Sequence, residues 1–65
     1  MRLTEKEWDD AADLFEQGAV MAENSYETHS PAACEYAIKR MNSLAMFATG
    51  KAMGEKERED RHATP

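Results

Sequence analysis

The chain has 65 residues, of which 42% are hydrophobic and 32% charged, and its formal net charge is −5. Eleven of the hydrophobic residues are alanines, so few side chains are large enough to build a core. Ordering a residue costs about 1.5 kcal/mol, and this chain has little apolar area to offset that cost. The length and composition therefore exclude a multi-domain enzyme and a deep active site enclosed by this chain alone. They also exclude a collagen-like or low-complexity protein.

Several features favour the cytoplasm over a membrane or the cell exterior. The longest apolar runs, residues 18–22 and 44–48, are far shorter than the ~20 residues that a membrane-spanning helix needs. The first residues become acidic where a signal peptide would be apolar. The single cysteine, Cys34, cannot form an intrachain disulfide, and small secreted domains usually depend on disulfides. We therefore expect a cytoplasmic protein without membrane contact.

Charge is unevenly distributed along the chain. Residues 1–30 contain two basic side chains against eight acidic ones, whereas residues 31–65 contain six basic and five acidic ones. A protein that binds nucleic acid directly usually carries a clustered basic patch. The first half of this chain shows the reverse, so direct binding to DNA or RNA is not expected.

The first helix is predicted over about residues 5–24. Thr4 and Glu7 have the spacing of a capping box, and Leu3 and Trp8 have the spacing of a hydrophobic staple. Apolar residues then recur at steps of three and four, as they do on one face of a helix. This stripe contains Trp8, Ala11, Ala12, Phe15, Ala19 and Ala22, and Leu14 and Met21 are expected to widen it on one side.

A polar connection at residues 25–30 leads to a second predicted helix. Ser30 and Pro31 are typical of a helix start, because serine caps free amides and proline fits the first helical position. This helix is expected to run from residue 31 to about 49, or to 53, with Gly50 and Gly54 as candidate C-terminal caps. The sequence thus predicts a hairpin domain of residues 1–54. Residues 55–65, which are almost wholly charged, are predicted to form a partly ordered tail.

Two helices joined by a short loop form an all-α antiparallel hairpin, which has little interior of its own. Two hairpins related by two-fold symmetry can complete a four-helix bundle, so we predict a homodimer. Its self-association core is expected to combine large apolar side chains of both helices with one small residue. These residues are Trp8, Phe15, Met41, Leu44 and Ala45.

Candidate chemical sites are few. His29 and Cys34 lie near each other in the sequence, but structural zinc sites need paired ligand spacings that this chain lacks. Nucleophilic catalysis needs a base and an orienting group beside the nucleophile, and the sequence suggests no such arrangement for Cys34. Gly50 and Gly54 do not have the spacing of a phosphate-binding loop. We therefore expect no enzymatic activity, no metal and no cofactor.

A helix that is apolar on more than one face usually packs against more than one neighbour. In the second helix Tyr36, Arg40 and Phe47 form such a second edge, and aromatic and arginine side chains are frequent in binding hot spots. The sequence thus predicts a protein-binding module, an inhibitor or adaptor of a larger host protein, with these three residues facing that partner. In size, acidity and its single cysteine the chain resembles the short acidic helical accessory proteins with which phages and other mobile elements block host enzymes or defence systems. This resemblance is one of type and implies no role for an individual residue.

Two other functions are compatible with the same sequence. Acidic side chains follow one side of the first helix, and carboxylates four residues apart are ~6 Å apart along its axis. Such a row can imitate the phosphates of DNA and inhibit a nucleic-acid-binding enzyme. The row consists of Glu5, Asp9, Asp13 and Glu16. The second alternative is a structural subunit that assembles only with itself.

Overall fold

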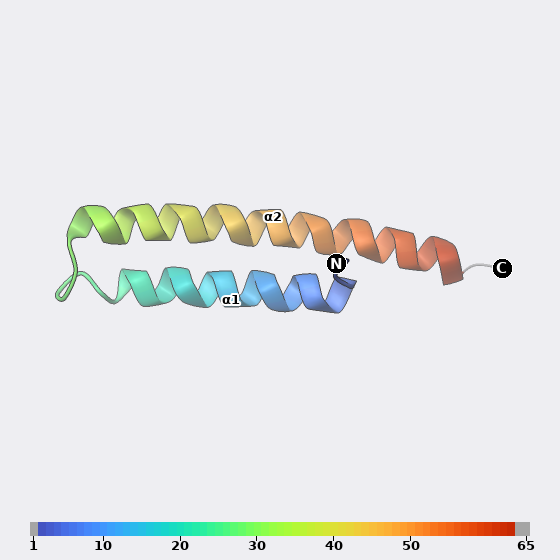
Figure 1. Cartoon of the computed structure of the whole chain (residues 1–65), viewed down its shortest axis with the longest axis horizontal. Helices are drawn as coiled ribbons and strands as arrows, with labels where there is room; N and C mark the ends of the chain where they lie inside the picture. Colours follow the sequence, from blue (N-terminus) through green and yellow to red (C-terminus); the bar gives the residue numbers. More distant parts are fainter. Residues whose placement is uncertain (1, 64–65) are drawn as a thin grey trace.

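The first helix begins where its capping residues predict. In the computed structural model, which describes residues 2–63, helix α1 spans Glu5–Glu23 (Figure 1). The Thr4 hydroxyl accepts a hydrogen bond from the Glu7 amide at 3.2 Å, and the Glu7 carboxylate accepts one from the Thr4 amide at 2.9 Å. Two amides at the helix start thereby gain partners, and the predicted capping box is confirmed.

Replacing Thr4 with alanine removes the hydroxyl that caps α1 and leaves the Glu7 amide without this partner. We expect Thr4→Ala to lower the free energy of unfolding by about 1 kcal/mol. Urea denaturation followed by circular dichroism measures the change. Thr4→Ser keeps the hydroxyl and is the matched control, so an equal loss in Thr4→Ser would show that the hydroxyl does not stabilise this helix start.

Residues 24–30 connect the helices and contain a turn. In this turn the amides of Thr28 and His29 donate hydrogen bonds to the Ser25 carbonyl, at 3.1 and 2.9 Å. At the end of this connection the Ala33 amide donates to Ser30 Oγ at 3.2 Å, which caps the second helix. That helix, α2, begins at Pro31. The predicted serine–proline helix start is therefore confirmed.

Helix α2 spans Pro31–Ala63, so the ends predicted at 49 or 53 are both wrong. A glycine that caps a helix usually takes a positive φ, and neither Gly50 nor Gly54 does so. The charged residues that follow are mostly good helix formers, and the predicted tail is instead the last part of α2. Residues 64 and 65 of that tail lie outside the described residues.

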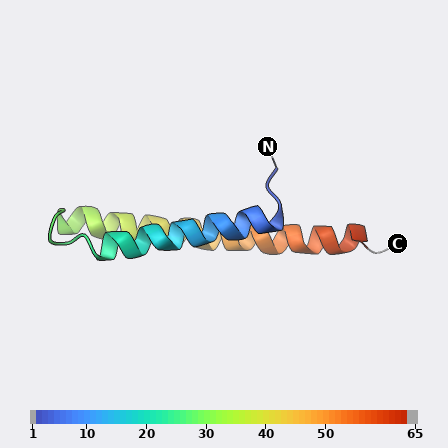
Figure 2. The ribbon, with the colours of Figure 1, turned by 90° about the horizontal axis from the view of Figure 1, so that it is seen from below.

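The two helices lie side by side and antiparallel, and α2 extends well past the start of α1 (Figure 1 and Figure 2). The fold is the predicted all-α helical hairpin, with no strand among residues 2–63. It measures 56 × 18 × 13 Å along its principal axes, with a radius of gyration of 15.3 Å. A compact domain of this length would have a radius of gyration of about 11 Å. The elongated shape leaves most side chains near the surface.

Small side chains form the core between α1 and α2. The buried residues of the described part are Ala12, Ala19, Cys34, Ala45, Ala48 and Ala52, none larger than cysteine. Gly18 also lies at this interface, since a Cβ built on it would lie 3.3 Å from the sulfur of Met41. Small residues allow the two helices to approach closely, but they bury little apolar area.

Large hydrophobic side chains remain outside this core. Those that are 41% to 76% exposed are Leu14, Val20, Met21, Tyr26, Tyr36, Met46, Phe47 and Met53. The prediction that Leu14 and Met21 widen the buried face of α1 is wrong. Each follows a buried alanine by two residues, which at about 100° per residue places it nearly opposite the buried face.

Neither helix, within the described residues, combines the length and the apolar character that crossing a membrane would require.

Candidate interaction surface

An aromatic contact joins the two helices at the edge of the hairpin. The rings of Trp8 and Phe47 meet edge to face, with centroids 5.9 Å apart and planes at 81°. The Lys51 ammonium lies 5.6 Å from the centroid of the Phe47 ring. Phe47 still exposes 55% of its surface, and Trp8 is half-buried. The sequence predicts Trp8 in the self-association core and Phe47 on the partner-facing edge, whereas in the structure the two rings are in contact.

The residues predicted to form the self-association core have mixed surroundings within one chain. Ala45 is buried, whereas Trp8, Phe15, Met41 and Leu44 are half-buried. Trp8 contacts Phe47, and Met41 lies against Gly18, so both already serve the packing of α1 on α2. A second chain can therefore cover only the part of these side chains that the hairpin leaves open.

The residues predicted to face a partner lie on the outer side of α2. Tyr36 is 70% exposed, and Arg40 is exposed as well. Together with Lys39 and Ser43 they line a shallow hollow of about 260 Å³. The structure thus brings Tyr36 and Arg40 together, and it places Phe47 two helical turns further along α2, beside Trp8.

The acidic row of α1 borders two hollows between the helices. Glu5 and Asp9 line a hollow of about 200 Å³ together with the basic Lys56 of α2. Glu16 lines a larger hollow, of about 490 Å³, beside two methionines of α2. The row is therefore not an isolated negative strip, because a basic side chain lies at one end and apolar side chains at the other.

Asp13 of the acidic row and the nearby Asp10 already have partners. The Gln17 amide donates a hydrogen bond to Asp13 at 2.8 Å, and Lys6 forms an ion pair with Asp10 at 3.0 Å. The hydrogen bond and the charge of Asp10 raise the pKa of Lys6. Imitation of DNA by Glu5, Asp9, Asp13 and Glu16 gains no specific support from these contacts and stays a prediction.

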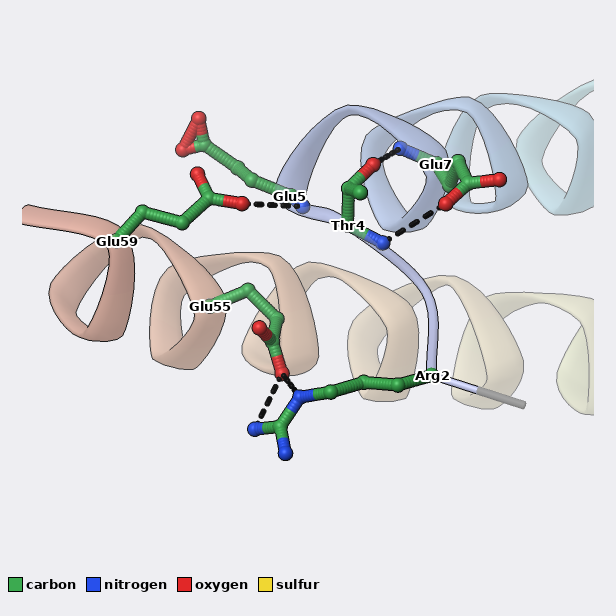
Figure 3. Close-up of polar contacts among 6 residues, drawn as sticks. All are labelled: Arg2, Thr4, Glu5, Glu7, Glu55 and Glu59. Atoms are coloured by element: carbon green, nitrogen blue, oxygen red, sulfur yellow. Dashed lines mark hydrogen bonds and ion pairs between the residues drawn. The ribbon is translucent and has the colours of Figure 1, made fainter. Parts of the chain in front are cut away.

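The N-terminal segment binds the last part of α2 (Figure 3). The Nε and Nη2 atoms of Arg2 both lie 2.9 Å from Oε1 of Glu55, whose side chain is only 16% exposed. The Glu59 carboxylate accepts a long hydrogen bond, 3.5 Å, from the Glu5 amide. A carboxylate at a helix N-terminus is stabilised by the helix dipole. These contacts help to keep α2 helical beyond Gly54.

His29 and Cys34 line one hollow of about 350 Å³ at the loop end of the hairpin, together with small and apolar residues. His29 Nδ1 forms a hydrogen bond with the Thr28 hydroxyl at 2.9 Å, and Cys34 is buried. Partial burial of the nearby Tyr26 raises the pKa of its hydroxyl, and the charge of Glu35 adds to the shift. Among the residues whose placement is described, no group of three His, Cys, Asp or Glu side chains could hold a metal ion.

Comparisons of the chain with protein-family models, with curated proteins and with solved structures find no match. Arguments about its function therefore depend on its own surface.

Proposed function

We propose that this chain is a non-enzymatic, cytoplasmic protein-binding module, which inhibits or recruits a larger host protein. The main support is the apolar surface that the hairpin leaves open. Eight large hydrophobic side chains of a 65-residue chain are 41% to 76% exposed. Four of these, Tyr36, Met46, Phe47 and Met53, lie on α2, and a helix with an exposed apolar face can dock on another protein.

The binding edge is assigned to Tyr36, Arg40 and Phe47 on the outer side of α2. All three are exposed, and aromatic and arginine side chains contribute most to binding energy in known interfaces. Arg40 has no ion-pair partner within the described residues, so its guanidinium is available to a carboxylate of another chain. Tyr36 and Phe47 supply large contact areas on either side of it.

Affinity capture from a nuclease-treated bacterial lysate, at low and high salt and read by mass spectrometry, tests this function. The wild-type bait is expected to retain one stoichiometric host protein that survives high salt. Tyr36→Ala and Arg40→Ala baits should retain about tenfold less of it, since loss of one hot-spot residue costs more than 1 kcal/mol. A Val20→Ala bait changes an exposed apolar residue of α1 and is the control, so it should retain the full amount.

Equal capture by all these baits would contradict the assignment of the binding edge. A host nucleic-acid enzyme that is lost at high salt would instead favour the acidic row of α1. Recovery of the bait alone would favour a structural subunit that assembles only with itself.

A further inference from the structure

A strip of exposed residues runs along the outer side of α2, and packing within the hairpin uses only Phe47 of this strip. From Tyr36 onward its residues follow one another by four and three positions alternately, so they lie on one side of the helix. We define this outer seam as Tyr36, Arg40, Ser43, Phe47, Gly50 and Gly54. All six residues are exposed in the hairpin.

The two glycines of the outer seam are not required inside the chain. Glycine destabilises a helix interior relative to alanine, and neither Gly50 nor Gly54 has a positive φ that would need it. A Cβ built on either glycine would meet nothing within 4 Å. Their missing side chains instead leave two depressions, one helical turn apart, into which a side chain of another helix fits.

The chain also exposes more surface than a compact protein of its mass. Its accessible surface is 5201 Å², whereas a compact monomer of 7.3 kDa exposes about 4,200 Å². The difference, about 1,000 Å², is close to the roughly 800 Å² that each partner buries in a standard protein interface. One chain of similar size, covering the outer side of α2, would remove this excess.

We propose that the occupant of the outer seam is a second copy of this chain, with the two α2 helices antiparallel about a two-fold axis beside Ala48 and Thr49. This inference rests on the proposed function, because it names the protein that the Tyr36, Arg40 and Phe47 edge binds first. A larger host protein then binds the dimer, so loss of Tyr36 or Arg40 lowers its capture through loss of the dimer.

The position of this axis sets the register, that is, which residues of the two α2 helices face each other. In this register large side chains of one copy face small residues of the other. The Phe47 ring faces Gly50 of the second copy, and Ser43 faces Gly54 of the second copy. Beside the seam, Met46 comes next to Met53 of the second copy. The register covers four of the eight exposed hydrophobic side chains, namely Tyr36, Met46, Phe47 and Met53.

Charges match in the same register. Arg40 faces Glu57 of the second copy, which is an opposite-charge pair. Tyr36 faces Arg61 of the second copy, which allows a cation–π contact. Because α2 spans Pro31–Ala63, an axis near its middle overlaps the two α2 helices along most of their length. The part of α2 that extends past α1 in Figure 1 thereby gains a neighbour.

The acidic face of α1 is less suitable for a second copy. Glu5, Asp9 and Glu16 lie on that face, and Glu16 lines a hollow with Met46, Gly50 and Met53 of α2. Two copies meeting there would bring like-charged carboxylates together and remove them from water, which disfavours association.

Sedimentation equilibrium of the full chain over a range of concentrations tests which face is used. The wild type is expected to be a dimer, and Gly54→Gln should raise the dimer dissociation constant about tenfold or more, because a side chain fills the depression. Gly54 has open space around it in the hairpin, so the variant should fold, which circular dichroism checks. Val20→Gln is the control on the acidic side, four residues after Glu16, and should leave the dissociation constant unchanged.

Charge reversal tests the register. Arg40→Glu or Glu57→Arg alone places like charges across the two-fold axis and should weaken the dimer about tenfold. The double variant restores opposite charges and should recover the wild-type dissociation constant. Arg40 and Glu57 lie about 25 Å apart along one straight helix, so such a recovery can arise only between chains.

This inference is overturned if Gly54→Gln leaves the dimer dissociation constant unchanged. It is also overturned if the double variant Arg40→Glu with Glu57→Arg does not recover the wild-type dissociation constant. Either result leaves the proposed binding function standing. If the wild type is a monomer and captures a host protein through Tyr36 and Arg40, the dimer inference is wrong and the proposed binding function stands. A monomeric wild type that captures nothing contradicts both proposals.

Discussion

Ala48→Leu is expected to disrupt the hairpin more than any other single change considered. Ala48 has 0% of its surface exposed, in the middle of α2. Extra methylene groups at a close-packed position force strained rotamers or push the helices apart, which costs about 1 to 3 kcal/mol. A small domain rarely has more than about 3 to 5 kcal/mol of stability. The urea midpoint, followed by circular dichroism, should therefore fall sharply.

Ala32→Leu is the matched control for this change. Ala32 is exposed in the first turn of α2, and the same substitution there should alter the free energy of unfolding by no more than about 0.5 kcal/mol. If Ala48→Leu unfolded at the same urea concentration as Ala32→Leu, small residues would not set the distance between the two helices.

Trp8→Ala is expected to have the second-largest effect. It removes the edge-to-face contact with Phe47, whose ring centroid lies 5.9 Å away. Truncating a fully buried tryptophan costs about 3 to 5 kcal/mol, and for the half-buried Trp8 we expect about 2 kcal/mol. Since Trp8 is the chain's only tryptophan, circular dichroism replaces fluorescence as the measurement. Trp8→Phe keeps an aromatic ring and should lose less.

A double-mutant cycle isolates the contact between these two rings. The stability losses of Trp8→Ala and Phe47→Ala should fail to add by about 0.5 to 1.5 kcal/mol. The comparison cycle pairs Trp8→Ala with Tyr36→Ala, a residue on the outer side of α2, and should be additive. Additive losses in both cycles would mean that the two rings do not stabilise one another.

Both helix starts could be predicted because their chemistry is local. Thr4 and Glu7 are three residues apart, and Ser30 precedes the helix that it caps. The end of α2 could not be predicted in the same way. The contacts of Glu55 and Glu59 with the N-terminal segment join residues more than fifty positions apart, as the Arg2 to Glu55 separation of 53 shows. Gly50 and Gly54 therefore predict a helix end, whereas such contacts let the helix continue.

The spacing of Tyr36, Arg40 and Phe47 predicts one edge of α2, and all three residues are exposed in the structure. The contact between Trp8 and Phe47 could not be predicted, because it depends on how α1 is rotated about its own axis. A stripe rich in alanine does not fix that rotation, since several faces of the helix are then small enough to pack. Leu14 was expected beside the buried stripe for the same reason.

The burial of Cys34 has a kinetic consequence. Cys34 is the only thiol of the chain and exposes 4% of its surface. A maleimide or disulfide reagent can reach it only after the beginning of α2 has separated from its neighbours. When reclosing is faster than alkylation, the ratio of its labelling rate to that of a free thiol gives the equilibrium constant for this local opening. Cys34 thus reports local unfolding at the beginning of α2 without an introduced probe.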